Sequence, residues 1–189
     1  YAGGARLYAA AAFGRDSRGA AVDIERIGAA LDWLLGNNVR LINMSFAGPV
    51  NASLDDLMTG AAARGAVLIA AAGNGGNARA VYPAASDAVI AVTAVDARMR
   101  RYRSANTGTH IEFAAPGVDL YVAKGSGGGY ASGTSYAAPI VTGLAARLMA
   151  RGILSPAAIR AQLQAQSLDL GQPGRDSAFG WGLAKSPGC

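Results

Sequence analysis

The sequence predicts an α/β fold in which helices cover both faces of a mostly parallel β-sheet. Short runs of apolar, often β-branched residues recur along the chain, and segments with helical periodicity lie between them. The apolar runs do not alternate with polar residues, which is typical of parallel strands buried on both faces. With 51% apolar and 15% charged residues, the 189 residues can form one packed domain.

Strands and helices are expected to follow one another along the chain. Each expected strand is a short apolar run, and each expected helix has apolar residues at spacings of three and four. In chain order we expect a buried strand over 7–12, a helix over 24–35, a strand over 39–44, a helix over 53–64, strands over 66–72, 89–95 and 111–114, a helix over 134–151 and a last helix opened by Ser155-Pro156.

Capping residues mark where the helices should begin and end. Ser53 and Asp56 have the Ser-x-x-acid form of a capping box. Gly36 and Gly65 stand where the first two helices should stop. Pro139 is expected to fall within the opening turn of its helix, where a missing backbone N–H costs little.

Charge and cysteine usage exclude several functional classes. The net charge is +5, but the densest basic cluster lacks the aromatic residues that stack on bases, so we expect no nucleic-acid partner. That cluster consists of Arg98, Arg100, Arg101 and Arg103. The longest apolar runs, around 66–72, are too short to span a membrane. The single cysteine, Cys189, excludes an intrachain disulfide and a metal site built from cysteines.

Two loops follow predicted strands at the sheet edge where ligands bind in α/β proteins. Ser45–Gly48 comes directly after the strand that ends at Met44, and 72–76 follows the next strand. If these strands are neighbours, both loops line one cleft, and the Asn74 amide can donate to a developing oxyanion. Alternatively, Gly-Asn-Gly-Gly is a turn that only requires positive φ angles.

The sequence Gly-Thr-Ser-Tyr-Ala-Ala-Pro over 133–139 places Ser135 at the start of a helix. Backbone N–H groups there have no partners within the helix, and the helix dipole favours negative charge. A serine hydroxyl in this position can act as a nucleophile whose oxyanion meets amide donors. The alternative is that Ser135 is only an N-cap residue.

Four motifs together resemble the subtilisin-like serine proteases, the subtilase family. They are Leu-Ile-Asn-Met-Ser at 41–45, Ala-Ala-Ala-Gly-Asn at 70–74, Ala-Ala-Pro-Gly-Val at 114–118 and the 133–139 motif, in family order and at family-like spacings. The resemblance extends from about residue 6 to 184. It implies a subtilisin-like three-layer sandwich, incomplete at its N-terminal side, and peptide-bond hydrolysis through an acyl-enzyme.

The resemblance also implies roles for individual residues. Ser135 resembles the family's nucleophile and Asn74 its oxyanion-hole amide. Ser45–Gly48 resembles the strand that pairs with the substrate backbone, and Val81 would lie near the base of the pocket for the residue preceding the cut bond. The implied substrate-binding residues are Ser45, Phe46, Ala47, Gly48, Ala72, Gly73, Val81 and Thr134. Gly125–Gly129 could be a phosphate-binding loop or a flexible approach to the nucleophile. The second is expected, because the segment lacks the Lys-Ser/Thr ending of a P-loop.

The family's Asp and His motifs have no counterpart in the sequence. The one histidine, His110, matches no family base and is expected in a surface loop. We therefore expect residues 1–189 to be a single partial catalytic domain, inactive alone, with its base supplied by an N-terminal segment; that segment or a propeptide would be its partner.

Other functions stay open at this stage. A degenerate subtilase-like module could bind peptides without turnover, and loose glycine spacing leaves a nucleotide-binding domain as a third reading. The resemblance further implies a polypeptide substrate, a secreted or cell-envelope location, and no cofactor. Calcium is frequent in the family, but no carboxylate cluster in the sequence marks a site.

Overall fold

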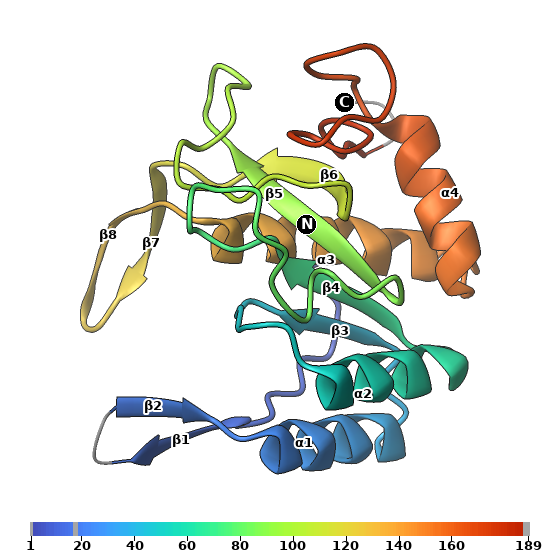
Figure 1. The fold of residues 1–189 in the computed structure, drawn as a ribbon. Coiled ribbons are helices and arrows are strands. Elements are labelled where there is room, and N and C mark those ends of the chain that lie inside the picture. The colour runs from blue at the N-terminus through green and yellow to red at the C-terminus, as the bar shows by residue number, and fades with distance from the viewer. Residues whose placement is uncertain (1, 17–18, 187–189) are drawn as a thin grey trace.

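The computed structural model describes residues 2–16 and 19–186. Its central sheet has four parallel strands in the order β3-β4-β5-β6 (Figure 1). These strands are β3 (Leu41–Met44), β4 (Val67–Ala71), β5 (Val89–Val95) and β6 (Ile111–Pro116). Two antiparallel hairpins accompany the sheet, namely β1 (Phe13–Asp16) with β2 (Gly19–Val22) and β7 (Leu120–Lys124) with β8 (Gly127–Ala131). The helices are α1 (Ile24–Gly36), α2 (Ala52–Ala63), α3 (Thr134–Met149) and α4 (Pro156–Gln166).

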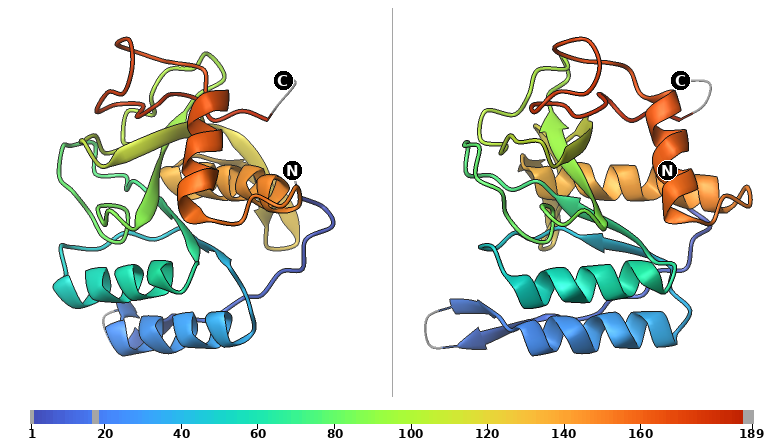
Figure 2. Two further views of the ribbon diagram at one scale, coloured as in Figure 1. Left: turned by 90° about the vertical axis from the view of Figure 1, so that its right-hand side faces the viewer. Right: turned by 45° about the vertical axis from the view of Figure 1, so that its right-hand side comes forward.

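Two apolar cores lie on opposite faces of the sheet. Helices α1 and α2 pack on one face and α3 on the other, as Figure 2 shows. All five residues of β4 are buried, because successive side chains of a strand point to opposite faces. Leu68 packs in the core with α1 and α2, whereas Val67 and Ile69 pack in the core with α3 and α4. The α/β prediction of a parallel sheet covered on both faces is confirmed.

The expected buried strand over 7–12 is wrong. This segment has no strand structure, and the side chain of Leu7 is 91% exposed. The apolar run was sufficient for a strand by composition, but a strand also needs a neighbour to pair its backbone groups. Among the described residues β3 pairs only with β4, so one edge of β3 stays open beside this segment.

The expected capping box of α2 is also wrong. Asn51 is the N-cap, and its Oδ1 accepts a hydrogen bond from the backbone N–H of Leu54 at 2.9 Å. Asn and Ser are equally good cap residues, and the helix begins at the earlier one. Ser53 therefore lies inside the first turn. Gly65, with φ of +84°, follows the end of this helix as expected.

Pro139 does not lie in the opening turn of its helix. Helix α3 begins at Thr134, so Pro139 is its sixth residue. A proline at this position removes the N–H that would bond to the carbonyl four residues earlier, which is that of Ser135. The Ser45 hydroxyl donates to this carbonyl at 2.9 Å instead. A side chain from the end of β3 thus replaces a helix hydrogen bond.

The glycine-rich approach to α3 is more ordered than its composition indicates. Residues 127–131 form β8, which pairs with β7 from Leu120↔Ala131 to Lys124↔Gly127. Neither strand was expected, because glycine disfavours strands and the run over 127–129 carries no side chains to form a pattern. The segment Gly125–Gly129, expected to be a flexible approach to the nucleophile, thus forms the turn and the first part of β8.

The open edge of β3 and the exposed Leu7 generate a prediction about solution behaviour. Unpaired strand edges and exposed apolar side chains promote association. We expect the 189-residue chain alone to self-associate and to bind an environment-sensitive dye, measured by light scattering and fluorescence. Leu7→Ser should reduce the dye signal but leave the association through the edge. A monodisperse monomer that binds no dye contradicts this expectation.

Candidate active site

The two loops that follow β3 and β4 leave the sheet at the same edge. The strands pair in parallel register from Leu41↔Val67 to Met44↔Ala70. Because their carboxyl ends meet, Ser45–Gly48 and the Gly73-Asn74 turn lie together, as the sequence predicted for neighbouring strands. The amino end of α3 reaches this same edge.

A group of side-chain hydrogen bonds ties the start of α3 to the turn after β4. Asn74 Oδ1 accepts from the backbone N–H of Thr134 at 3.0 Å and from Thr134 Oγ1 at 3.1 Å. Thr134 Oγ1 in turn accepts from the backbone N–H of Gly73 at 3.1 Å. The fully used Oδ1 fixes the plane of the Asn74 amide. Its Nδ2 has no partner among the residues that the structure describes, and Asn74 is exposed, so this group is available to an acceptor in the cleft.

Gly133 allows the close approach of this turn to α3. Its φ is +155°, a conformation that side-chain-bearing residues rarely adopt. A Cβ here would lie 3.4 Å from Asn74 Nδ2, which is van der Waals contact, so the backbone conformation is the stronger reason for glycine.

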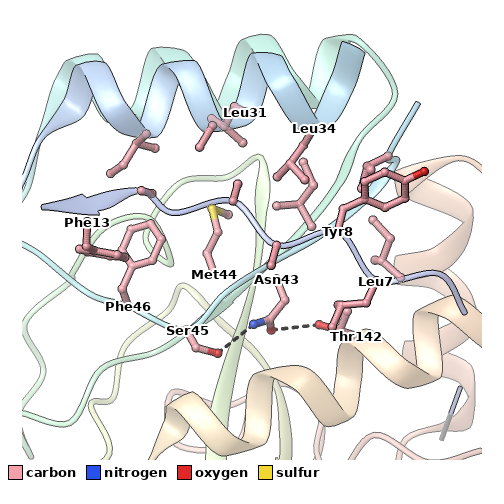
Figure 3. Close-up of a pocket in the computed structure, with 18 of the residues that line it drawn as sticks. Leu7, Tyr8, Phe13, Leu31, Leu34, Asn43, Met44, Ser45, Phe46 and Thr142 are labelled. Atoms are coloured by element: carbon pink, nitrogen blue, oxygen red, sulfur yellow. Dashed lines mark hydrogen bonds between the residues drawn. The ribbon is translucent and has the colours of Figure 1, made fainter. Parts of the chain in front are cut away.

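Ser135 and Ser45 form a reciprocal pair. The Ser135 hydroxyl donates to the Ser45 carbonyl at 3.1 Å, and the Ser45 hydroxyl donates to the Ser135 carbonyl at 2.9 Å. Asn43 extends this contact, because its Nδ2 donates to Ser45 Oγ at 2.9 Å and its Oδ1 accepts from Thr142 Oγ1 at 3.1 Å (Figure 3). The candidate nucleophile is therefore held against the loop after β3, which is expected to bind substrate.

The remaining predicted substrate-binding residues surround this point. Gly48 and Tyr82 exchange two backbone hydrogen bonds, of 2.8 and 3.0 Å, which join the loop after β3 to the Val81-Tyr82 segment. Val81 packs against Gly73. A Cβ built on Gly73 would lie 2.9 Å from Cγ2 of Val81, so the contact requires glycine at position 73.

The predicted residues differ in how accessible they are. Ala47 is exposed, whereas Ala72 and Gly73 are buried beneath the turn. Phe46 is half-buried and stacks edge-on against Phe13, with ring centroids 5.0 Å apart.

His110 lies far from this cleft in the fold. It immediately precedes β6, at the amino edge of the parallel sheet, whereas Ser135 stands at the carboxyl edge. It lies in the turn before β6, as expected for a loop residue, but it is half-buried and not fully exposed. Its Nε2 is buried without a hydrogen-bond partner in the described part of the chain. Burial lowers the pKa of His110, and the guanidinium of Arg175 lowers it further.

The described residues gather no group of three or more His, Cys, Asp or Glu side chains that could hold a metal ion. The largely buried carboxylate of Glu112 pairs with Arg160, with 3.0 Å between Oε2 and Nε. Burial raises the pKa of Glu112, and the nearby Arg160 opposes this effect. The described residues thus provide no carboxylate cluster for calcium, and no step of the chemistry below depends on calcium. No helix in 2–16 or 19–186 is long and apolar enough to cross a membrane.

Comparison with known proteins matches this geometry to a family. The family described as the subtilase family matches residues 1–182. The chain belongs to this family. The minor extracellular protease Epr of Bacillus subtilis (strain 168) is 34% identical over 192 residues, covering 95% of this chain and 28% of that protein. Subtilisin DY of Bacillus licheniformis is 38% identical over 149 residues, covering 75% of this chain and 54% of that protein.

Solved structures of two proteases share the fold. A lanthipeptide protease superposes with a TM-score of 0.77 at 23% identity, covering 89% of this chain and 65% of that one. The prenylagaramide maturation protease PagA gives a TM-score of 0.75 at 25% identity, covering 87% and 66%. This chain thus spans about a quarter of the length of Epr, at 28%, and about half of the length of subtilisin DY, at 54%.

Sequence reasoning overlooked several supporting residues. Thr134 was expected only to contact substrate, but it orients Asn74. Asn43 appeared only within the 41–45 motif, with no role of its own, and Thr142 was not predicted; a polar residue inside an apolar strand, such as Asn43, is a signal for a supporting role. Ser135 has no titratable side chain among the hydrogen-bond partners that the described residues provide.

The buried imidazole of His110 predicts a pH dependence of stability. Its folded-state pKa is below the ordinary value of about 6.5, so the unfolded chain takes up this proton first as the pH falls. The corresponding stability is present above pH 6.5 and is lost on acidification. We expect His110→Gln to flatten the decline of Tm between pH 7 and 5.5. Glu112 titrates in both proteins, so equal slopes contradict the assignment.

Proposed function

We propose that this chain carries the nucleophile and the oxyanion-binding half of a serine endopeptidase that hydrolyses polypeptides. One observation carries the proposal. Ser135 lies in the first turn of α3, and the residue before it holds the Asn74 amide by its Oδ1. Subtilase membership supports the same reaction class.

The proposed chemistry begins with attack of Ser135 Oγ on the carbonyl carbon of a peptide bond. The hydroxyl proton passes to a base, and negative charge develops on the carbonyl oxygen. Asn74 Nδ2 and the backbone N–H of Ser135, which has no acceptor among the described residues, stabilise that charge. The C–N bond then breaks, the base returns the proton to the leaving amine, and water hydrolyses the acyl-enzyme ester.

We assign the acyl side of the substrate to the loop after β3. An extended peptide would pair with the backbone of Ser45–Gly48, which recognises main chain regardless of sequence. Val81 would fill part of the pocket for the residue preceding the cut bond, since it stands between Gly73 and the Gly48–Tyr82 bridge. Medium and small residues should therefore be preferred there over large aromatic ones.

We assign the base to a segment outside the 189 residues. The open edge of β3 offers a place for it, because a cavity of about 480 Å³ lies between this strand, α1 and residues 6–13 (Figure 3). Leu31, Leu34 and Met44 contribute to its mainly apolar lining. An added strand would pair with β3 and end at the same edge as Ser135, where it could deliver a base.

We further propose a secreted or cell-envelope location. The name of Epr describes that relative as extracellular. The proposed reaction needs no cofactor, because serine, amide and base chemistry suffice.

A comparison of the isolated chain with the full-length protein tests the proposed function. The 189-residue chain alone should hydrolyse peptides no faster than its Ser135→Ala variant, because a serine without a base is a poor nucleophile. The full-length protein should show turnover that Ser135→Ala abolishes. Robust Ser135-dependent turnover by the isolated chain would refute the need for an external base.

A peptide-binding module without turnover is the second candidate. The hydrogen bond from the Ser135 hydroxyl to the Ser45 carbonyl favours it, since this contact occupies the nucleophile's proton. This candidate predicts that the full-length protein binds peptides, measured by fluorescence anisotropy, but releases no product. The endopeptidase predicts product formation and labelling of Ser135 by an organophosphate probe.

Replacement of Asn74 separates an oxyanion donor from a turn residue. In the full-length enzyme, Asn74→Ala should lower kcat by about 10²–10³, the loss typical of an oxyanion-hole amide in this family of enzymes. KM should hardly change, because the interaction forms mainly in the transition state. A variant with a lower Tm but normal kcat, measured with active-site titration, would show that Asn74 only shapes the turn.

A further inference from the structure

The β7–β8 hairpin is fixed at its base beside the candidate nucleophile. It leaves the sheet after β6, and β8 leads directly into Gly133 and α3. The backbone N–H of Gly133 donates to the Gly117 carbonyl at 2.7 Å, which closes the base. Above it, Ser132 Oγ donates to Asp119 Oδ1 at 3.2 Å and accepts from the backbone N–H of Asp119 at 2.9 Å. Figure 1 shows the hairpin extending from the main body of the fold.

Two tyrosines cover one face of this hairpin. Tyr121 and Tyr130 are directly opposite each other in the strand register, with ring centroids 5.5 Å apart at an interplanar angle of 73°. They are 71% and 70% exposed. The two rings therefore pack on the hairpin with one side and face solvent with the other. Gly128 allows this arrangement, because a Cβ there would lie 2.5 Å from the Tyr121 ring.

The position of the pair relative to Ser135 suggests what it contacts. Four residues lie between Tyr130 and Ser135, so the two are five Cα steps apart, which span at most about 18 Å when extended. The loop after β3 reaches Ser135 from one margin of the sheet, whereas the hairpin follows β6 at the other margin. If the acyl side of a substrate pairs with Ser45–Gly48, its leaving-group side is directed toward the hairpin.

We propose that Tyr121 and Tyr130 form an aromatic platform that binds an aromatic or large apolar side chain on the leaving-group side of the polypeptide substrate. The residue it binds is one of the first five after the cut bond, given the reach of the chain. Rings that meet edge-to-face or offset contribute beyond simple area burial, and rigid tyrosines lose little conformational entropy on binding. This assignment rests on the proposed endopeptidase function and determines specificity, not the chemistry at Ser135.

The test uses the full-length protease and internally quenched peptides that carry Phe or Ala at each of the first five positions after the cut bond. The parent should prefer Phe at one of them, and Tyr121→Ser/Tyr130→Ser should lower kcat/KM for that peptide about tenfold and for the Ala peptide little. Tyr121→Phe/Tyr130→Phe should keep the preference, because the rings and not the hydroxyls carry it. In a Ser135→Ala background, the serine double variant should weaken binding of the labelled Phe peptide by a similar factor.

Two control variants separate the outcomes. Leu154→Ser removes an exposed apolar side chain, 60% exposed, just beyond the far end of α3, and should leave all preferences unchanged. Val81→Gly should change the preference before the cut bond but not after it. A serine double variant that keeps the Phe preference after the cut, or loses only acyl-side preferences, overturns the platform while the protease function stands. A parent without Ser135-dependent cleavage overturns both.

Discussion

The start of α3 relative to the sheet is the constraint on which the candidate site depends. Thr134 contacts Asn74 through both its backbone N–H and its hydroxyl, and that hydroxyl also accepts from Gly73. The helix therefore cannot move along the sheet edge without breaking all three bonds. Ser135, one residue further, inherits its position from this anchor. These bonds fix the relative positions of Asn74 and Thr134, which are sixty residues apart in the sequence.

Much of this arrangement could be predicted from local signals. The apolar runs that became β4 and β5 are long enough to identify a buried parallel sheet, and that sheet predicts which edge carries the chemistry. The Gly-Asn-Gly turn after β4 and the Gly-Thr-Ser start of α3 each indicate a backbone that needs glycine. The parallel sheet brings this turn and this helix start to the same edge. The family motifs then predict that Ser135 is the nucleophile and that Asn74 is the oxyanion-hole amide.

The features that were not predicted depend on distant partners. Residues 7–12 have the composition of a strand but no paired neighbour, and sequence periodicity does not report a neighbour. The place of Pro139 in its helix depends on where the Asn74 contact starts α3. The β7–β8 hairpin is stabilised by backbone pairing and by the contact between two tyrosines. A glycine-rich sequence gives no periodic pattern from which this pairing could be predicted. Competition between Asn51 and Ser53 as caps is decided by differences too small for a sequence rule.

The carbonyl of Ser45 has a consequence for inhibitor chemistry. It accepts the Ser135 hydroxyl in this structure, and it belongs to the strand that is proposed to pair with peptide backbone. A ligand that brings its own N–H to this carbonyl would compete with the Ser135 hydroxyl for the same oxygen, so binding of the ligand would weaken the hydrogen bond that holds the proton of the nucleophile. Ester or N-methylated analogues lack that donor. Such compounds would not compete with the Ser135 hydroxyl for the Ser45 carbonyl.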